Sequence, residues 1–177
     1  MQKTLVVAGG GAAGFFCALT AARLNPQLRV VIVEKTGKLL SKVKVSGGGR
    51  CNVTHACFSI PDMARNYPRG ALFVRKTFYQ FFTTDTIQWF EERGVKLKQE
   101  DDGRMFPVSN SSQSVIDCLL REAKQYGVEI RIHHEIGAIE TGDRFKLRFS
   151  NGWELGADFL CIACGGYPKA AMFDWIK

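Results

Sequence analysis

Acidic residues are scarce in one part of this sequence. Between Lys35 and Thr84 the chain has nine lysines or arginines and a single acid, Asp62, whereas the rest of the chain is slightly acidic. A local excess of positive charge favours one anionic ligand, or a channel for an anionic substrate, over a long track of phosphates. A solvated basic face accounts for the same composition and stays an alternative.

Aromatic residues interrupt this basic stretch. Phe73, Phe78 and Tyr79 are interleaved with its cations, a pattern that nucleic-acid-binding surfaces also use. Because such residues usually belong to the core when they recur with a helical period, we expect no nucleic-acid partner. Nucleic acid is kept only as a minor alternative.

Several recognisable catalytic arrangements are missing. The sequence has no nucleophile elbow, no cluster of metal ligands and no pair of carboxylates at catalytic spacing. It therefore predicts no metal site and leaves the catalytic residues unidentified. Internal repeats and low-complexity segments are absent too, and a hydrophobic content of 46% excludes a disordered chain.

An export signal and a membrane span are not predicted either. The run from Leu5 to Ala22 is uncharged, but its glycines would break a membrane helix and instead indicate a strand, a turn and a helix. We therefore expect a cytoplasmic protein with no membrane partner, whose six cysteines are mostly free thiols. Cys161 and Cys164 fall in an apolar strand, and we interpret them as core residues.

The first chemical motif is a glycine-rich turn in a βαβ unit. Gly9, Gly11 and Gly14 form GxGxxG between an apolar strand and a helix. In that position they provide a tight turn, a close approach of the backbone to a pyrophosphate, and close packing of the helix on the strand. The pyrophosphate would bind at the helix N-terminus, where Ala12 and Ala13 follow.

An acidic residue stands where the same motif predicts one. Glu34 ends the second strand, 20 residues after Gly14. A carboxylate there can accept hydrogen bonds from both hydroxyls of an adenosine ribose, and it would repel a 2′-phosphate. The motif thus predicts FAD or NAD and not NADP, with Lys35 as a further contact. A βαβ unit that packs without a ligand is the alternative.

The rest of the chain predicts helices, an antiparallel meander and one more strand. Helical periodicity, glycine stops and polar–apolar alternation mark the boundaries. The predicted elements are helices over 73–81, 83–94 and 115–127, a strand over 128–132, a meander over 137–158, a strand over 159–164, and the start of a helix at 170–177 with nothing to pack on.

This order resembles the FAD domain of the glutathione-reductase-like superfamily. In that superfamily a meander precedes a strand whose A-T-G-G-like end passes beside the cofactor; here it is Ala163-Cys164-Gly165-Gly166, with cysteine at the usual threonine position. The fold class is accordingly expected to be α/β. We expect a Rossmann-like FAD-binding domain with a parallel central sheet, an antiparallel three-stranded meander and a helical insertion.

A second glycine triplet makes the resemblance specific to one family within this superfamily. The segments GKLLSKVKVSGGGRCNVTH and GRMFPVSNSSQSVIDCLL together resemble the BaiN-like family of bacterial NAD(P)/FAD-dependent oxidoreductases, over essentially the whole chain. Members of that family are longer. Residues 1–177 are therefore expected to be the N-terminal portion of an FAD-binding domain, without the inserted substrate domain and the C-terminal segment that closes the flavin site.

The resemblance implies roles for the second triplet. Gly48 and Gly49 would pack along the flavin, Arg50 would give charge to the diphosphate or the flavin carbonyls, and Asn52 would offer an amide to the ring edge. Ile136 would contact the adenine through its backbone. The full expected cofactor-binding set is Gly9, Gly11, Ala12, Ala13, Gly14, Glu34, Lys35, Lys42, Gly48, Gly49, Arg50, Cys51, Asn52, Ile136, Ala163, Cys164 and Gly165.

Cys51 has two interpretations. A thiol beside Arg50 could be acidified and redox-active, whereas a small polarizable residue packed on the flavin explains its presence as well. Cys57 follows six residues later, one position too far for the G-G-T-C-x4-C motif of pyridine nucleotide-disulfide reductases. Packing is the favoured interpretation of Cys51.

The resemblance also implies the activity. We expect an FAD-dependent oxidoreductase that reduces a small organic substrate through the flavin with NAD(P)H as electron donor. It implies that FAD is tightly bound only in the full-length protein and that the fragment alone is inactive. The alternatives are a disulfide reductase that uses Cys51 and Cys57, and a nucleotide-binding scaffold without catalysis.

Overall fold

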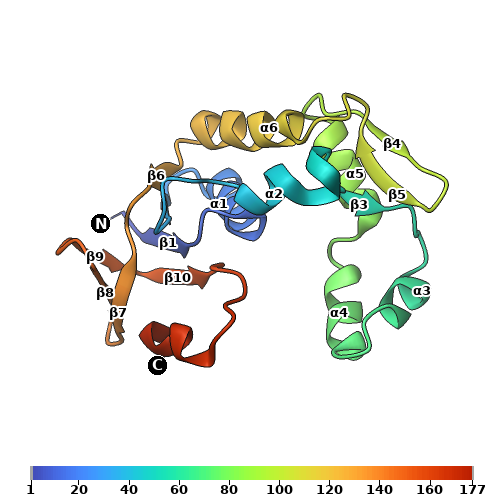
Figure 1. The fold of residues 1–177 in the computed structure, drawn as a ribbon. Helices are drawn as coiled ribbons and strands as arrows, with labels where there is room; N and C mark the ends of the chain where they lie inside the picture. The colour runs from blue at the N-terminus through green and yellow to red at the C-terminus, as the bar shows by residue number, and fades with distance from the viewer. Residues whose placement is uncertain (1, 177) are drawn as a thin grey trace. The chain divides into compact units, whose positions relative to one another are not determined.

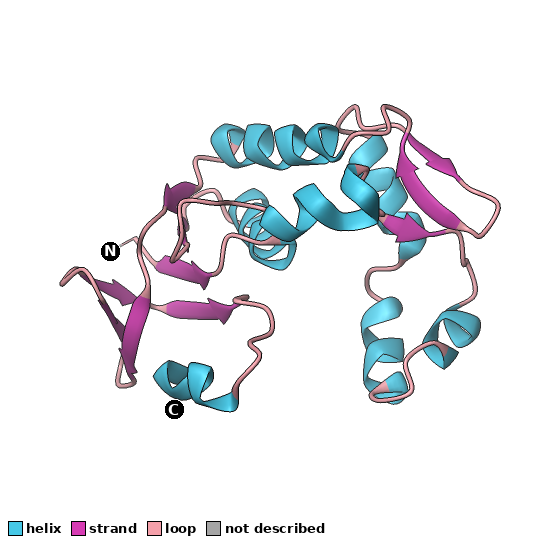
Figure 2. Cartoon of the chain, in the orientation of Figure 1, coloured by secondary structure: helices cyan, strands magenta, loops and turns pink. Residues whose placement is uncertain are grey.

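The computed structural model describes residues 2–176 of the chain, which divide into two compact units. Of the described residues, the first unit comprises 2–42 and 119–176, and the second comprises Val43–Cys118. Figure 1 traces the chain through both units, and Figure 2 distinguishes their helices and strands. Each unit is described by itself below.

A four-stranded parallel sheet forms the centre of the first unit. Its order is β10-β1-β2-β6, so the first strand of the chain pairs with the last (Figure 1). The strands are rich in valine and isoleucine, as expected for a sheet covered on both faces. Their bounds are β1 Thr4–Ala8, β2 Arg29–Val33, β6 Glu129–Arg131 and β10 Phe159–Ile162.

Helix α1, Ala12–Leu24, packs against this sheet. It buries a stripe that contains Phe15, Ala18 and Leu19, whose spacing of three and four residues places them on one helix face. Gly14 lies on the same side, where an added Cβ would be 3.4 Å from a methyl group of Val7. The predicted strand, turn and helix are therefore present.

The meander supplies the second layer on the sheet. Its strands are β7 Ile136–Glu140, β8 Phe145–Phe149 and β9 Glu154–Ala157, antiparallel in that order. Leu147 and Phe149 are buried in one hydrophobic cluster with Val6 and Val31 of the parallel sheet. The meander thus covers the sheet face that Val6 and Val31 form, as alternation along the strands requires.

The last described segment departs from its prediction. Residues Ala170–Ile176 form a short 3₁₀ helix, η2, and Trp175 packs against the cluster between sheet and meander. The expectation of a helix with nothing to pack on was therefore wrong. Cys161 and Cys164 also differ from their interpretation as core residues, because both are partly exposed.

The second unit combines helices with a small antiparallel sheet that the sequence did not predict. Strands β3 Thr54–His55, β5 Arg104–Pro107 and β4 Leu97–Gln99 pair in that order (Figure 2). The segment around Phe106 lies outside every helix and strand predicted from the sequence, yet it forms β5 and buries that ring completely. The insertion is therefore mixed and not purely helical.

Short helices make up the rest of the second unit. Phe82 precedes α5, and its backbone N–H donates to the Asp85 carboxylate at 2.7 Å, a contact typical of a helix N-terminus. Helix α5 therefore begins at Thr83, where the predicted helix over 83–94 also begins. Helix α6 contributes residues to both units. The bounds are α2 Ser41–Val45, η1 Ser46–Gly49, α3 Ile60–Arg65, α4 Ala71–Phe78, α5 Thr83–Glu91 and α6 Ser112–Gln125.

The structure confirms the predicted fold class, an α/β domain with a parallel sheet, an antiparallel meander and an insertion. Within residues 2–176, no helix combines the length and the apolar character needed to cross a membrane.

Candidate functional site

Two glycines of the first turn are required by the chain itself. Gly9 has a φ of 121°, and a Cβ there would lie 2.4 Å from the carbonyl oxygen of Ala163. At Gly14 a Cβ would lie 1.9 Å from the carbonyl oxygen of Gly9, so the helix could not approach the turn with any larger residue. These two positions therefore serve the close packing of α1, β1 and the end of β10.

Gly11 is different, because no contact within residues 2–176 requires a glycine at this position. Its φ is −91°, which any residue adopts, and a Cβ built there meets no atom within 4 Å. It is also the N-cap of α1, which has no side-chain cap and no acid in its first turn. The first N–H groups of α1 thus meet an open space that suits an anion.

The Glu34 carboxylate is directed at this turn. Its Oε2 accepts from the Gly10 N–H at 3.0 Å, and its Oε1 accepts from the N–H and the hydroxyl of Thr36, both at 2.9 Å. A carboxylate has about four lone-pair positions, so about one is left for a further donor. A ribose diol that binds through both hydroxyls would have to displace the Thr36 hydroxyl.

A pocket opens beside Glu34. Its volume is about 60 Å³, well below the roughly 300 Å³ at the lower end of small-molecule sites. It brings together five residues of the predicted set from four separate parts of the sequence: Gly9, Glu34, Lys35, Ile136 and Cys164. The complete lining is Ala8, Gly9, Val33, Glu34, Lys35, His134, Glu135, Ile136, Cys164, Tyr167 and Trp175.

Two aromatic residues of this pocket are not among those predicted from the sequence. Lys35 places its ammonium group 4.6 Å from the centre of the Tyr167 ring, a cation–π contact, and Trp175 lines the pocket beside it. Burial raises the pKa of Tyr167, an effect that the positive charge of Lys35 partly offsets. Neither residue belongs to a periodic pattern, so the only signal was their position soon after the Gly165-Gly166 pair.

The end of β10 adds a second glycine turn to the first unit. Ala163 donates to the Ala8 carbonyl at 2.8 Å, and Gly165 follows with a φ of 72°. The Lys42 ammonium group lies 3.5 Å from the point where a Gly165 Cβ would be. Lys42 and this turn are therefore neighbours.

The second glycine triplet belongs to the second unit, where η1 follows α2. Gly47, Gly48 and Gly49 have φ values of 55°, 67° and 87°, three successive left-handed residues that other amino acids rarely form. A Cβ at Gly47 would lie 2.6 Å from the Phe106 ring, whereas a Cβ at Gly48 meets nothing within 4 Å. The triplet thus packs through Gly47 and leaves Gly48 open.

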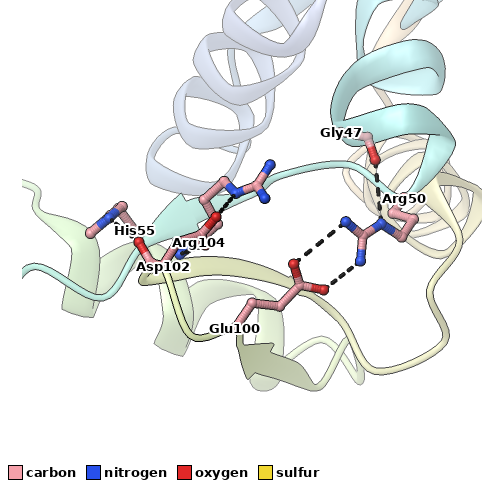
Figure 3. A network of polar contacts seen from close by, with 6 residues as sticks. All are labelled: Gly47, Arg50, His55, Glu100, Asp102 and Arg104. Atoms are coloured by element: carbon pink, nitrogen blue, oxygen red, sulfur yellow. Dashed lines mark hydrogen bonds and ion pairs between the residues drawn. The ribbon is translucent and has the colours of Figure 1, made fainter.

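Arg50 is held by partners within the second unit (Figure 3). Its guanidinium forms an ion pair with Glu100, donates through Nε to the Gly47 carbonyl at 3.4 Å, and lies 4.1 Å from the centre of the Phe106 ring. These contacts fix the glycine triplet against β5. To bind a diphosphate or a flavin, Arg50 would have to use those guanidinium N–H groups that do not bond to Glu100 or Gly47.

Cys51 is a buried residue in a left-handed conformation. Its φ is 64°, its backbone N–H donates to Ser46 at 2.9 Å, and its side chain is 6% exposed. Burial raises the pKa of the thiol, and a weaker hydrogen bond with Ser46 acts against that rise. The neighbouring Arg50 does not acidify it, which favours packing over redox activity.

Other candidates take structural positions. Cys57 is a free thiol that donates to the Ser59 carbonyl at 3.6 Å, and Asn52 has an exposed side chain. His55 contacts the Asp102 carbonyl at 3.1 Å and covers Gly103, next to the Asp102–Arg104 ion pair (Figure 3). These contacts stabilise the turn between β4 and β5.

A comparison with known protein families identifies the family to which the chain belongs. The model of the HI0933-like protein Rossmann domain matches residues 3–172. The chain belongs to this family. The match confirms the resemblance that the two glycine triplets indicated, and it covers both structural units.

Relatives with assigned names are similar over nearly the whole chain. The 3-dehydro-bile acid delta(4,6)-reductase of Clostridium scindens is 28% identical over 94% of this chain and 40% of its own length. The ribosomal RNA dihydrouridine synthase of Escherichia coli is 29% identical over 91% of this chain and 39% of its own length. The chain therefore spans about two fifths of the length of these relatives.

A solved structure has the same fold. A flavocytochrome c3 fumarate reductase in an open conformation aligns with a TM-score of 0.69, at 22% identity, over 93% of this chain and 34% of that protein. At this identity the likeness shows the fold alone.

Proposed function

We propose that this chain binds the adenosine diphosphate part of FAD at the first glycine turn. The observation that carries the proposal is Gly11, an open glycine that neither its backbone angles nor its neighbours require. A side chain there would fill the space in front of the uncapped α1 N-terminus, where a diphosphate gains N–H donors and the helix dipole. Membership of a Rossmann-domain family supports the same assignment.

Specific residues would bind each part of this ligand. The backbone from Gly9 through Ala12, Ala13 and Gly14 would hold the diphosphate. Glu34 would accept from the ribose, and its charge would discriminate against a 2′-phosphate.

The pocket would take the adenine. Its lining includes Lys35, Ile136 and Cys164, the last of which follows β10. Because the pocket is smaller than an adenosine needs, Tyr167 and Trp175 would have to move aside on binding.

The contacts on the flavin side are proposed from the family resemblance. They comprise Lys42, Ala163 and Gly165 of the first unit with Gly48, Gly49, Arg50, Cys51 and Asn52 of the second. Gly48 supports this role, since a Cβ there would meet no atom of the chain and its open backbone could lie against a flat ring.

The activity proposed is reduction of an organic substrate. Bound FAD would supply hydride transfer, with NAD(P)H as the donor, while the chain binds and orients it. The words reductase and dihydrouridine in the names of two relatives describe added hydrogen, which supports this direction of reaction. A small organic substrate agrees with the bile acid in the first name, whereas the second name gives ribosomal RNA. A disulfide reductase is disfavoured because burial raises the pKa of Cys51.

Titration of the chain with flavins tests the proposal. FAD is compared with FMN, which has the flavin but no adenosine, and ADP is added as a competitor. We expect FAD to bind more tightly than FMN and ADP to displace it. Glu34→Gln should weaken FAD, whereas the exposed Glu140→Gln serves as the matched control. Equal binding of FMN and FAD, or no effect of ADP, would contradict the adenosine site. Anaerobic addition of NADH or NADPH to the full-length protein separates an oxidoreductase from a scaffold, since only the former bleaches the bound flavin.

A further inference from the structure

Helices α3 and α4 form a hairpin in the second unit, and each packs chiefly on the other. The partly buried residues of α4 are Ala71, Val74 and Phe78, which lie three and four positions apart and so form its packed side. Phe78 also makes an edge-on contact with Tyr67, at 5.7 Å between ring centres. The loop of residues 66–70 lies at the end of the hairpin that is far from β3 (Figure 1). We call this loop and the first turn of α4 the arm tip.

The arm tip exposes large apolar side chains. Leu72 and Phe73, in the first turn of α4, are 78% and 75% exposed, and Tyr67 in the loop is 40% exposed. Leu72 and Phe73 therefore leave most of their surface uncovered by their own unit, although covering it would be favourable. A cluster of exposed apolar residues of this kind is typical of a surface that binds a partner.

Cations without partners surround the arm tip. Arg69, Arg75 and Lys76 are exposed, and within residues 2–176 none of them has an ion-pair partner. Residues 63–84 contain no acid, and Asp62 before them is bound by Arg65 at 2.8 Å. This end of the hairpin therefore carries positive charge with no counter-charge of its own.

We propose that the arm tip binds the surface of an anionic lipid bilayer. Leu72 and Phe73 would insert just below the headgroups, at the depth where surface helices bury their apolar side chains. Arg75 and Lys76 follow them by two to four residues, which is about 3 to 6 Å along the helix axis. These cations would then lie at the level of the acidic headgroups, which Arg69 can also reach with its long side chain.

The combination of apolar and basic side chains decides the kind of partner. An apolar protein surface would cover Leu72 and Phe73 but would leave Arg75 and Lys76 desolvated without a counter-charge, which is unfavourable. A second copy of the chain would bring the same unpaired cations together, and like charges across an interface repel each other. A bilayer with acidic lipids offers an apolar layer and negative headgroups at adjacent depths, so charge complementarity favours it.

This inference is compatible with the absence of a membrane span. The sequence-based expectation of no membrane partner rested on that absence within the chain, and a contact at the bilayer surface needs no span. The inference is also independent of the FAD proposal, because the first glycine turn belongs to the first unit and the arm tip to the second. Vesicle binding is measured without flavin, so a failure of either proposal leaves the other standing.

Co-sedimentation of the 177-residue chain with lipid vesicles tests the proposal. Vesicles of phosphatidylcholine alone are compared with vesicles of phosphatidylcholine and phosphatidylserine in equal parts. We expect much stronger binding to the second kind, and weaker binding as added salt screens the charges. Lys76→Gln should weaken this binding about fivefold, the usual contribution of one cation at an anionic surface. Phe73→Ser should weaken it about tenfold or more.

Matched variants separate lipid insertion from other effects. Phe73→Trp should retain binding, and its added indole should show a blue shift of emission, relative to the wild type, when anionic vesicles are present. Leu24→Ala on α1 and Lys124→Gln on α6, both exposed and remote from α4 in sequence, should bind like the wild type. Circular dichroism confirms that each variant is folded. If Phe73→Ser fails to fold, Phe73→Trp and Lys76→Gln decide.

Several results would overturn the proposal. These are no binding of the wild type to anionic vesicles, equal binding to vesicles of phosphatidylcholine alone, or unchanged binding by the Leu72→Ser/Phe73→Ser double variant. Displacement of the chain from vesicles by soluble phosphoserine would overturn it too, because the cations would then bind a free phosphate group. Self-association that Phe73→Ser abolishes, without vesicle binding, would assign the arm tip to a second copy of the chain.

Discussion

Alanine at Gly11 should weaken ligand binding, whereas alanine at Gly14 should destabilise the fold, although both substitutions add one methyl group to the same turn. At Gly11 the new Cβ meets no atom within 4 Å and the φ of −91° suits alanine. Replacing glycine where the backbone is compatible stabilises a protein by about 0.4 to 1 kcal/mol. Glycine is also preferred over alanine at an N-cap, which acts against this gain, so the melting temperature of Gly11→Ala should stay within about 2 °C of that of the wild type.

Ligand binding should fall in the same variant. A methyl group in the space in front of the α1 N-terminus would push a diphosphate away from its N–H donors. A displacement of this kind is expected to remove about 2 kcal/mol, in the range of overpacking, which weakens FAD binding about 30-fold.

Gly14→Ala should instead destabilise the fold. Its Cβ would lie 1.9 Å from the Gly9 carbonyl oxygen and 3.4 Å from a Val7 methyl group, so α1 must move away from β1. A loss of about 1 to 3 kcal/mol is expected before any ligand is added. Thermal denaturation without ligand and titration with FAD measure the two effects separately. If Gly11→Ala binds FAD as the wild type does, the diphosphate does not lie over Gly11 and the central argument for the site fails.

Three further predictions follow from the same contacts. Glu34→Arg should abolish measurable FAD binding, because the ribose loses its acceptor and Gly10 N–H loses its partner; normal FAD affinity would remove the adenosine assignment. Burial and a hydrogen bond with Cys161 raise the pKa of Cys17 to about 11, so iodoacetamide followed by peptide mass spectrometry should label it slowly at pH 8 and faster above pH 10. The stability that this protonated thiol contributes is present below pH 9 and is lost as the pH rises through about 11; rapid labelling of the folded chain at pH 8 would contradict the burial argument. Finally, calorimetry should find only weak FAD binding to the 177-residue chain, because its pocket of about 60 Å³ is partly filled by Tyr167 and Trp175, and submicromolar affinity would show that the site is already formed.

Local sequence patterns predicted the elements whose signals are strong and continuous. The βαβ unit follows from an apolar run, three glycines and a helix, and the meander follows from alternation with turn residues at 141–143 and 150–152. The α6 face containing Val115, Leu119 and Ala123 is buried as its period predicts.

Other features depend on tertiary contacts that no local pattern carries. Strands β3, β4 and β5 are two to four residues long, too short to show alternation. Helix α4 has the aromatic period of a core helix, yet Phe73 and Tyr79 are exposed, and none of the eight residues of this helix is buried.

The candidate site was predicted unevenly for the same reason. Glycine spacing located Gly9, Gly11, Gly14 and Glu34, because the geometry of the turn fixes those distances. Which glycine serves packing and which stays open could not be predicted, since it depends on Ala163, about 150 residues away. Tyr167 and Trp175 entered the pocket through folding of the last described segment, which has no sequence motif of its own.

The pairing of β1 with β10 also has a consequence for how the chain folds during synthesis. The two strands are adjacent in the sheet, and Thr4 N–H donates to the Asp158 carboxylate across 154 residues of sequence. Contacts of such separation form late, because a long loop must close before they stabilise anything. The first glycine turn leaves the ribosome early but lacks the Ala163 carbonyl against which Gly9 packs. The edge of β1 that pairs with β10 therefore stays unpaired and apolar until β10 has been synthesised.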